Sequence, residues 1–520
     1  MGRAMLMLFE GGEGMEFATD YLERSASAWP ERTAVVDAGG EMTFGQMAWE
    51  ARAVGAALAM AGLRKAPVAL WMGREASSIA ASQGAAMSGS PYAPMDITLP
   101  PKRLIHMLEI LQPSAVIVRE KHAESLRKLL AGADLAQTPV LLVYEKITAE
   151  TPPQRALKAL EEAAAKRLPQ DPLCILFTSG STGRPKGVAV SHELICHQID
   201  ENLSIFGLDE TQVRAGQVPL YFTMGAYDDV YSVLATGGRL LLLSSGQMLF
   251  PRKLMKLFRE QGVNTLFWVP SMLRLTADSG ALELPEEELP KLKFISFAGE
   301  PMPKSTLSAW QRKFPEAAFV NRYGATELGP ASYEFIRGTG QELTLGKALP
   351  GQEMLLLDED GDEVIHPGGV GEVCVRGLMA LGYWREPELT ARAFVQNPLQ
   401  QSYPERLYRT GDLARLTGEG KYVYLSRRDS QIKHMGYRIE LGEIEAAAAE
   451  IEGLRCACLY RAENDELVLF YAGDFTPKEI MTELSTMLPR YMWPACLEKM
   501  EELPYTGSGK VDRQALKKLL

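Results

Sequence analysis

ILFTSGSTGRPKGVAVSH, residues 175–192, decides how this chain folds and what it binds. The apolar run at residues 173–177 predicts a strand that leads into a loop rich in glycines and hydroxyl side chains. Glycines let several backbone N–H groups reach one anion, hydroxyls add donors, and a lysine adds a point charge. The stretch therefore predicts a phosphate-holding loop made by Thr178, Ser179, Gly180, Ser181, Thr182, Gly183 and Lys186. It is not a Walker A loop, because Gly187 follows the lysine.

On both sides of this loop, strand-like apolar runs alternate with helical patterns up to about residue 340. This alternation predicts an α/β protein with parallel sheets. The later stretch LLLDEDGDEVIHPGGVGEVCVRG, residues 355–377, places Asp-Gly and Gly-Gly turns between alternating runs and predicts an antiparallel β subdomain. The last ninety or so residues predict a small α/β unit. We place the domain boundary between residues 428 and 429, although no Pro/Gly-rich linker marks it.

Composition narrows the class of protein. The chain has 520 residues, of which 46% are hydrophobic and 23% are charged, as expected for a globular protein of at least two domains. A net charge of −11 makes nucleic acid an unsuitable partner. No apolar run approaches membrane-spanning length, and Glu10 and Glu13 interrupt the N-terminal stretch, so we expect a cytoplasmic protein that uses no membrane. The six scattered cysteines predict reduced thiols, and no second Cys/His pair completes a cysteine metal site.

Eight motifs in order make the chain resemble the acyl-adenylate-forming superfamily, over nearly its whole length. They are MTFGQM (42–47), SGSPYAPMD (88–96), the phosphate loop, FAGE (297–300), NRYGATE (321–327), YRTGDL (408–413), SRRDSQIKHMGYRIELGEIE (426–445) and GSGKVDR (507–513). This superfamily contains the adenylation domains of non-ribosomal peptide synthetases, acyl-CoA synthetases and D-alanine–carrier-protein ligases. The resemblance implies a large adenylation domain, residues 1–428, of two α/β subdomains and a β subdomain. A small mobile α/β domain, residues 429–520, follows it.

The resemblance implies an ATP site and assigns residues to it. Tyr323 is similar to the ring that stacks on adenine, and Asn321 to a contact with the base edge. Asp412 resembles the carboxylate that accepts the ribose hydroxyls, and Glu327 a hard oxygen ligand for Mg²⁺. The remaining residues matched to ATP or AMP contacts are Gly299, Glu300, Arg322, Gly324, Ala325, Thr326, Tyr424 and Arg427. Ser426 departs from the glycine usual before that arginine.

Lys510 in GSGKVDR resembles the lysine that holds the substrate carboxylate against the α-phosphate. The resemblance implies two half-reactions. A carboxylic acid and Mg-ATP first give acyl-AMP and pyrophosphate. The small domain then swings about Asp429, Lys510 leaves, and residues 431–438 line a channel for a phosphopantetheine thiol.

The acid pocket departs from the pattern of α-amino-acid enzymes. Met224 stands where those enzymes carry the acidic partner of the α-ammonium, and shifting the alignment by a residue or two gives Thr223 or Phe222. The substrate therefore either lacks an α-amino group or has its amine met elsewhere, for example by Asp228. Asp228 also fits a purely structural role. The other pocket positions are Gly225, Trp268, Ser296, Ala298, Arg322, Pro330 and Ala331. Trp268 suggests a shallow pocket for a small acid, and Arg322 suits either a second carboxylate, a phosphate or solvent.

The sequence thus predicts a stand-alone ligase that activates an amino acid or amino-acid-like acid and passes it to a separate carrier protein. Since the chain ends seven residues after Arg513, we expect no fused carrier domain. An acyl- or aryl-CoA ligase stays open, because PLYFTMG loosely resembles a motif of acyl-CoA enzymes. A non-catalytic nucleotide-binding protein also stays open, although Lys186, Glu327, Asp412 and Lys510 argue against it. A luciferase-like oxidative enzyme is the third alternative, and no specific feature supports it.

Overall fold

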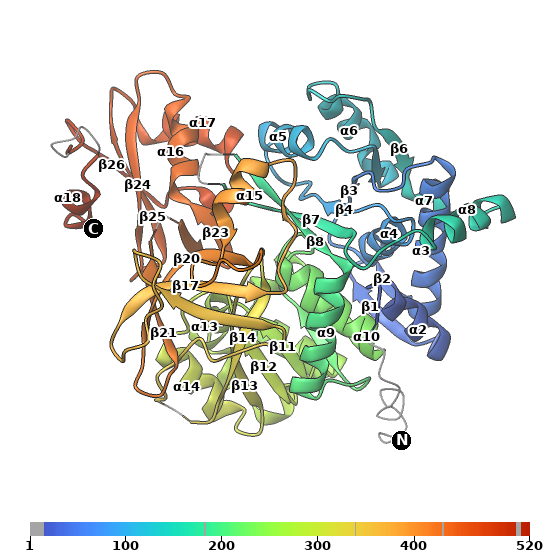
Figure 1. Cartoon of the computed structure of the whole chain (residues 1–520), viewed down its shortest axis with the longest axis horizontal. Helices are drawn as coiled ribbons and strands as arrows, with labels where there is room; N and C mark the ends of the chain where they lie inside the picture. Colours follow the sequence, from blue (N-terminus) through green and yellow to red (C-terminus); the bar gives the residue numbers. More distant parts are fainter. Residues whose placement is uncertain (1–14, 181–183, 339, 429–430, 506–510) are drawn as a thin grey trace.

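The computed structural model of the chain describes residues 15–180, 184–338, 340–428, 431–505 and 511–520. The chain folds into four parts that follow one another along the sequence, and the C-terminal part, drawn in orange to red, lies at one end of the molecule (Figure 1). Five expected site residues, Ser181, Thr182, Gly183, Asp429 and Lys510, lie outside the described residues. The predicted boundary at 428/429 borders the same gap and stays a prediction.

A seven-stranded mixed sheet carries the phosphate-loop motif. Its order is β18-β8-β7-β4-β3-β5-β6, with a parallel centre and antiparallel pairing at β7, β8 and β18. The strands are β3 (Val68–Trp71), β4 (Tyr92–Pro94), β5 (Ala115–Val118), β6 (Val140–Val143), β7 (Pro172–Thr178), β8 (Lys186–Ser191) and β18 (Gly382–Tyr383). The helices of this part are α3 (Phe44–Met60), α4 (Ala76–Met87), α5 (Pro101–Leu111), α6 (Ala123–Leu130), α7 (Tyr144–Thr148) and α8 (Gln154–Ala164).

Helices α3 and α4 cross closely because glycines stand where they meet. A Cβ on Gly55 would lie 2.9 Å from Gly84 O, and a Cβ on Gly84 would meet Ala51 O and the side chain of Val54. Neither contact leaves room for a methyl group. The two helices therefore form one tightly packed layer.

A nine-stranded sheet forms the second part, in the order β15-β14-β13-β12-β11-β9-β10-β1-β2. The strands are β1 (Thr33–Asp37), β2 (Gly40–Thr43), β9 (Val213–Gly216), β10 (Arg239–Leu242), β11 (Thr265–Trp268), β12 (Phe294–Phe297), β13 (Ala318–Ala325), β14 (Gly329–Ile336) and β15 (Lys347–Ala348). Strands β1 and β9 to β13 pair in parallel, whereas β2, β14 and β15 pair antiparallel. The helices here are α2 (Asp20–Ala28), α9 (His192–Phe206), η2 (Met224–Tyr231, a π-helix), α10 (Ser232–Thr236), α11 (Ser245–Met248), α12 (Pro251–Gln261), α13 (Pro270–Asp278) and α14 (Lys304–Lys313).

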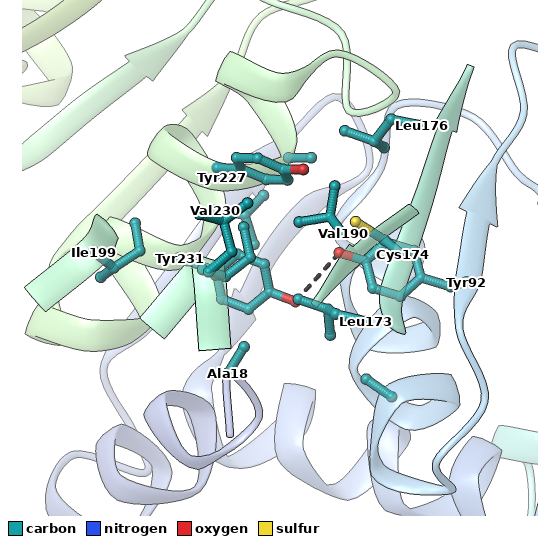
Figure 2. Packing of buried hydrophobic residues seen from close by; sticks show 14 of the residues in the cluster. Ala18, Tyr92, Leu173, Cys174, Leu176, Val190, Ile199, Tyr227, Val230 and Tyr231 are labelled. Carbon is teal, nitrogen blue, oxygen red and sulfur yellow. Dashed lines mark hydrogen bonds between the residues drawn. The ribbon is translucent and has the colours of Figure 1, made fainter. Parts of the chain in front are cut away.

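The two large sheets share one hydrophobic core. Figure 2 shows Tyr92 and Cys174 from the seven-stranded sheet facing Tyr227 and Tyr231 of η2, with Ala18 nearby. The Tyr92 and Tyr231 hydroxyls lie 3.2 Å apart and share a hydrogen bond. The cluster continues into the third part of the chain, for example to Tyr408. These three parts therefore pack as one body.

The third part is an antiparallel five-stranded sheet, as predicted. It contains β16 (Gln352–Leu357), β17 (Val370–Gly377), β19 (Phe394–Gln396), β20 (Arg406–Leu416) and β21 (Tyr422–Arg427), with α15 (Pro387–Ala393) alongside. The small C-terminal unit has the hairpin β22 (Gln431–His434) and β23 (Tyr437–Glu440). Its other elements are β24 (Arg455–Arg461), β25 (Glu466–Ala472), β26 (Cys496–Lys499), α16 (Leu441–Ala449), α17 (Pro477–Met487) and α18 (Arg513–Lys517). The predicted fold class is confirmed.

Buried charges fasten the small unit to the large part. Arg103 of α5 forms an ion pair with Glu443 of α16, and their side chains are 8% and 2% exposed. Lys102 bonds to Glu450 at 3.1 Å on the outside of the same contact. Burying an ion pair favours one relative arrangement, because either charge alone would be costly to desolvate. The contact therefore holds α16, which directly follows the hairpin, against α5.

All six cysteines are free, and Cys174, Cys196, Cys374 and Cys458 are buried. Within the described ranges, no helix has both the length and the apolar composition needed to span a bilayer.

Candidate active site

A cavity of about 150 Å³ lies where the strands of both large sheets end, with the β22–β23 hairpin as a further wall. Strand β7 ends at Thr178, β12 is followed by Ala298, and β13 carries Arg322 and Tyr323. Ligands of open α/β sheets bind at such carboxyl ends. The predicted residues that line this cavity are Thr178, Ser179, Phe222, Met224, Asp228, Ala298, Gly299, Arg322, Tyr323, Gly324, Ala325, Thr326, Pro330, Asp412 and Arg427. The structure therefore brings the phosphate loop, the nucleotide motifs and the acid pocket to one place.

Other expected residues lie outside the cavity lining. Trp268 is fully buried, and its indole Nε1 donates to Ala215 O at 3.0 Å. Its neighbour Phe267 lines the cavity instead, because successive strand residues point to opposite faces. The aromatic ring that was expected from Trp268 to make the pocket shallow is therefore supplied by Phe267.

Four more positions face the protein interior or pack against backbone. Ser296 and Ala331 are fully buried, and the Ser296 hydroxyl has no hydrogen-bond partner among the described residues. A Cβ on Gly225 would come within 2.9 Å of Val218 O, so this glycine lets η2 pack closely. Gly180 is buried and does not reach the cavity in the described part of the chain. These positions shape the pocket from behind.

Three nucleotide candidates serve neighbouring contacts. Asn321 Nδ2 donates to Thr344 O at 2.9 Å. Glu300 Oε2 accepts from Ser271 N at 2.8 Å, and its other oxygen accepts from Gly436 N of the hairpin. Tyr424 packs against the large core. In this arrangement Asn321 and Glu300 therefore hold loops around the cavity.

Glu327 is the centre of a buried charge cluster beside the cavity. Its Oε1 accepts from Lys186 Nζ at 3.2 Å and from Tyr383 OH at 2.8 Å, and its Oε2 accepts from Arg438 Nη1 at 2.8 Å. Burial alone raises the pKa of this fully buried carboxyl, but Arg438 and Lys186 outweigh it and hold the pKa well below its usual range. Burial in turn lowers the pKa of Lys186. Glu327 is therefore ionised and fully partnered.

Mg²⁺, expected on Glu327, does not fit this arrangement. Both carboxylate oxygens already bond to Lys186, Tyr383 and Arg438. In the described ranges no group of three His, Cys, Asp or Glu side chains forms a metal cluster. Magnesium needs open oxygen ligands in octahedral geometry. Arg438 would have to leave Glu327 before the carboxylate could hold the ion.

A second cluster surrounds Asp412. Its Oδ2 accepts from Tyr323 OH at 2.7 Å and its Oδ1 from Arg427 Nη1 at 2.9 Å. Lys433 of β22 lines the same cavity, and burial lowers the pKa of its amine while Asp412 opposes that shift. The basic side chains Arg427, Lys433 and Arg438 therefore converge on one cavity, as an anionic ligand requires. A ribose would share Asp412 with Tyr323 and Arg427.

The far end of the acid pocket closes with a buried ion pair. Arg322 Nη1 donates to Asp228 Oδ1 at 2.8 Å, and both side chains are 4% exposed. Asn202 of α9 bonds to both partners, at 3.2 Å to Asp228 and 3.3 Å to Arg322. Phe267 lies 4.5 Å from the Arg322 guanidinium, ring centroid to carbon. The sequence suggested independent roles for Asp228 and Arg322, whereas the structure joins them in one ion pair.

Sequence reasoning missed several cavity-lining residues. Arg103 and Tyr491 come from α5 and from the segment after α17, where no motif drew attention to them. Tyr383 does not line the cavity but stands beside it, where it bonds to Lys186 and Glu327 across a large gap in sequence that no spacing rule reveals. The other missed residues are Pro94, Asp96, Leu99, Met107, Phe177, Tyr221, Phe267 and Gly329. Thr223, the alternative to Met224, also lines the cavity, as do Gln431, Lys433, Gly436 and Arg438 from the stretch 431–438 that is expected to line the thiol channel.

The hairpin also borders a larger cavity, of about 940 Å³. Met435, Gly436 and Tyr437 line it from the small unit, and Tyr221 and Phe222 line both cavities. The Phe222 and Tyr437 rings lie edge to face, with centroids 5.0 Å apart. The two cavities therefore meet at the hairpin.

Comparison with known proteins identifies relatives of this arrangement. The family model described as "AMP-binding enzyme" matches residues 22–384. Delta-poly-L-ornithine synthetase of Acinetobacter baumannii (strain AB307-0294) is 31% identical over 96% of this chain, which spans 36% of that protein. The chain thus covers well under two thirds of this relative. The crystal structure of IdnL1 superposes with a TM-score of 0.77 at 27% identity, over 95% of this chain and 100% of that one. Holo-PA1221, described as an NRPS protein containing adenylation and PCP domains, shares the fold with a TM-score of 0.79 at 24% identity, over 97% and 84% of the two chains.

Proposed function

Because the chain belongs to the AMP-binding enzyme family, whose acyl-adenylate-forming members are AMP-forming ligases, we propose that it activates a small carboxylic acid with ATP and passes it to a carrier-protein thiol. One observation carries the proposal. Thr178 and Ser179, the Tyr323–Asp412–Arg427 cluster and the acid pocket at Asp228 and Arg322 line a single cavity. A nucleotide and an acid bound there would lie in contact.

In the first step, a carboxylate oxygen of the acid forms a bond to the α-phosphorus of ATP. The bond from that phosphorus to the bridging oxygen breaks, and pyrophosphate leaves. Arg427 and the loop N–H groups near Thr178 would neutralise the phosphate charge. Lys510 and the hinge Asp429 lie outside the described residues and remain proposals for this step.

In the second step, a thiol sulfur bonds to the acyl carbon, the bond to AMP breaks, and the thiol proton passes to solvent. The described arrangement supports this half-reaction, since Gln431, Lys433, Gly436 and Arg438 lie in the cavity. The neighbouring cavity of about 940 Å³, walled by the same hairpin, offers a path for a phosphopantetheine arm. A separate carrier protein is the acceptor we propose, in keeping with the adenylation–PCP composition of holo-PA1221.

Mg²⁺ enters this proposal only for an arrangement in which Arg438 has left Glu327. No step above depends on it. The cytoplasmic location remains a prediction.

ATP–pyrophosphate exchange with α-amino, β-amino, aryl and short aliphatic acids tests the first step. We expect exchange with at least one small acid. A chain that binds ATP yet exchanges with none of them would contradict the proposal and favour a non-catalytic nucleotide-binding protein. Offering free CoA and a holo carrier protein to the pre-formed acyl-adenylate separates the proposed acceptor from a CoA ligase.

A further inference from the structure

Asp228 offers the acid an unused hydrogen-bond acceptor. It lines the cavity from η2, and its Oδ1 takes both bonds, from Arg322 and Asn202. Its Oδ2 accepts no hydrogen bond from any residue in the described ranges. A buried carboxylate oxygen left without a donor is costly, and a ligand that brings a donor recovers that energy.

The other carboxylates of the cavity are already occupied. Asp96 Oδ1 accepts from Thr98, and its Oδ2 accepts from Tyr221 OH at 2.7 Å. Asp412 bonds to Tyr323 and Arg427 as described above. Among the described acidic residues lining the cavity, Asp228 alone keeps an oxygen for a substrate.

An ammonium group is a poor occupant of this position, because the surroundings already carry excess positive charge. Behind Asp228, Arg214 Nη1 donates to Asp228 O at 2.8 Å and lies 3.6 Å from Asp229 Oδ1. Arg74 interacts with Asp229 electrostatically. Three guanidinium groups, those of Arg322, Arg214 and Arg74, therefore face only two carboxylates.

Near neutral pH the net charge of this buried group of arginines and aspartates is more positive still. Burial raises the pKa of Asp229 to about 7, although Arg214 and Arg74 oppose the shift. Asp229 is thus only partly ionised there. A substrate ammonium beside Asp228 would add a further buried cation next to Arg322.

An anionic group does not suit the unused atom either, because that atom is a carboxylate oxygen and an anion brings it no donor. The two terminal nitrogens of Arg322 donate to Asp228 and Asn202, and its Nε is buried without a partner among the described residues. A second substrate carboxylate at this position would therefore place two anions side by side at Asp228. Nearer the nucleotide, Met224 provides no counter-charge for an α-ammonium.

We propose, building on the function above, that the activated acid carries an uncharged hydrogen-bond donor at the end remote from its carboxylate, such as a hydroxyl or an aromatic amine, which binds Asp228. Arg322 and Asn202 hold the Asp228 carboxylate in place for it. The substrate class is therefore a hydroxy or aminoaryl acid and excludes acids bearing an aliphatic ammonium.

Matched trios of acids test this inference by ATP–pyrophosphate exchange. One trio is 3-hydroxybenzoate, 3-(aminomethyl)benzoate and benzoate, and another is 4-hydroxybutanoate, 4-aminobutanoate and butanoate. Within the trio that fits the pocket, we expect kcat/KM of the hydroxyl member to exceed the other two by about ten- to a hundred-fold, the value of one hydrogen bond to a charged acceptor. A preference for the ammonium member, or for α-amino acids over both trios, would overturn the inference and leave the proposed ligase activity standing. Exchange with no acid at all would overturn the ligase activity itself.

A variant traces the preference to this site. Asp228→Leu combined with Arg322→Met removes both charges of the pair, and the hydroxyl member should then lose its advantage over the unsubstituted acid. Asp278→Asn, at an exposed position on α13, is the matched control and should keep the wild-type ratio. An unchanged ratio in a folded double variant, checked by thermal unfolding, would refute the role of Asp228. The wild-type comparison remains decisive if the double variant does not fold.

Discussion

Replacing Arg438 by methionine should separate the two half-reactions. Arg438 lies on the hairpin of the small unit, whereas Glu327 lies between β13 and β14 of the large part. Methionine keeps most of the side-chain stem but removes the charge. The change therefore weakens the docked arrangement of the hairpin and leaves the fold of each unit intact.

The size of the effect follows from burial. The Glu327 side chain is 0% exposed and that of Arg438 is 16% exposed. Removing one partner of a buried pair costs about 3–5 kcal/mol. The lower end of this range applies here, because Lys186 and Tyr383 still bond to Oε1 of Glu327 when Arg438 is removed from Oε2. A loss of about 3 kcal/mol lowers the docking equilibrium constant by about a hundred-fold.

Two assays measure how far the half-reactions separate. ATP–pyrophosphate exchange reports the first, and single-turnover transfer from pre-formed acyl-adenylate to a thiol reports the second. Transfer should slow far more than exchange in Arg438→Met. Amide hydrogen exchange should also accelerate in β22, in β23 and in the turn between them, where Gly436 N donates to Glu300. Arg455→Met, at an exposed site on β24, is the matched control. Equal losses in both reactions, with unchanged hydrogen exchange, would refute a docking role for Arg438.

Three further predictions address catalysis, acid stability and packing. Lys510→Ala should abolish adenylation while leaving ATP binding nearly intact, and unchanged pyrophosphate exchange in this variant would remove the proposed role of the lysine. Burial, and then Arg167, lower the pKa of His192 to about 3, and its Nδ1 accepts from Ala18 N. The unfolded chain therefore takes up this proton first as pH falls below about 6.5, so the unfolding free energy of the wild type should drop relative to His192→Gln by about 1.4 kcal/mol per pH unit, as urea titrations from pH 7.5 to 4.5 would measure. A constant difference across that range would show that His192 titrates normally in the folded state. Gly84→Ala should destabilise the protein by about 1–3 kcal/mol because its methyl group meets Ala51 and Val54. Gly338→Ala, with no atom within 4 Å of the new Cβ, is its control, and equal stability of the two variants in thermal unfolding would contradict the packing argument.

The fold and much of the cavity were predictable because they depend on local patterns. Apolar runs and turn residues indicated the parallel sheets, the antiparallel β subdomain and the small α/β unit, and the motifs around Thr178, Tyr323 and Asp412 reached one cavity. Each of those signals lies within a few neighbouring residues.

Contacts between distant segments were not predictable. Ser179 Oγ donates to Arg438 O at 2.6 Å across 259 positions, and Tyr383 bonds to Glu327 across 56. The prediction that Trp268 lines the cavity, where the structure has Phe267, failed for a different reason. A shift of one residue in a strand turns a side chain to the opposite face, and aligning motifs does not fix which face borders a cavity. Pairing of Asp228 with Arg322 likewise depends on how η2 lies against β13.

The shared core in Figure 2 has a consequence for calorimetry. One apolar cluster joins all three parts of the large domain, so melting any one of them would expose residues that the other two help to bury, even though each part also has a smaller cluster of its own. The small unit contains its own clusters, around Ile444 and around Phe470. A scan should therefore resolve two heat-absorption peaks rather than four, and the smaller enthalpy belongs to the C-terminal unit.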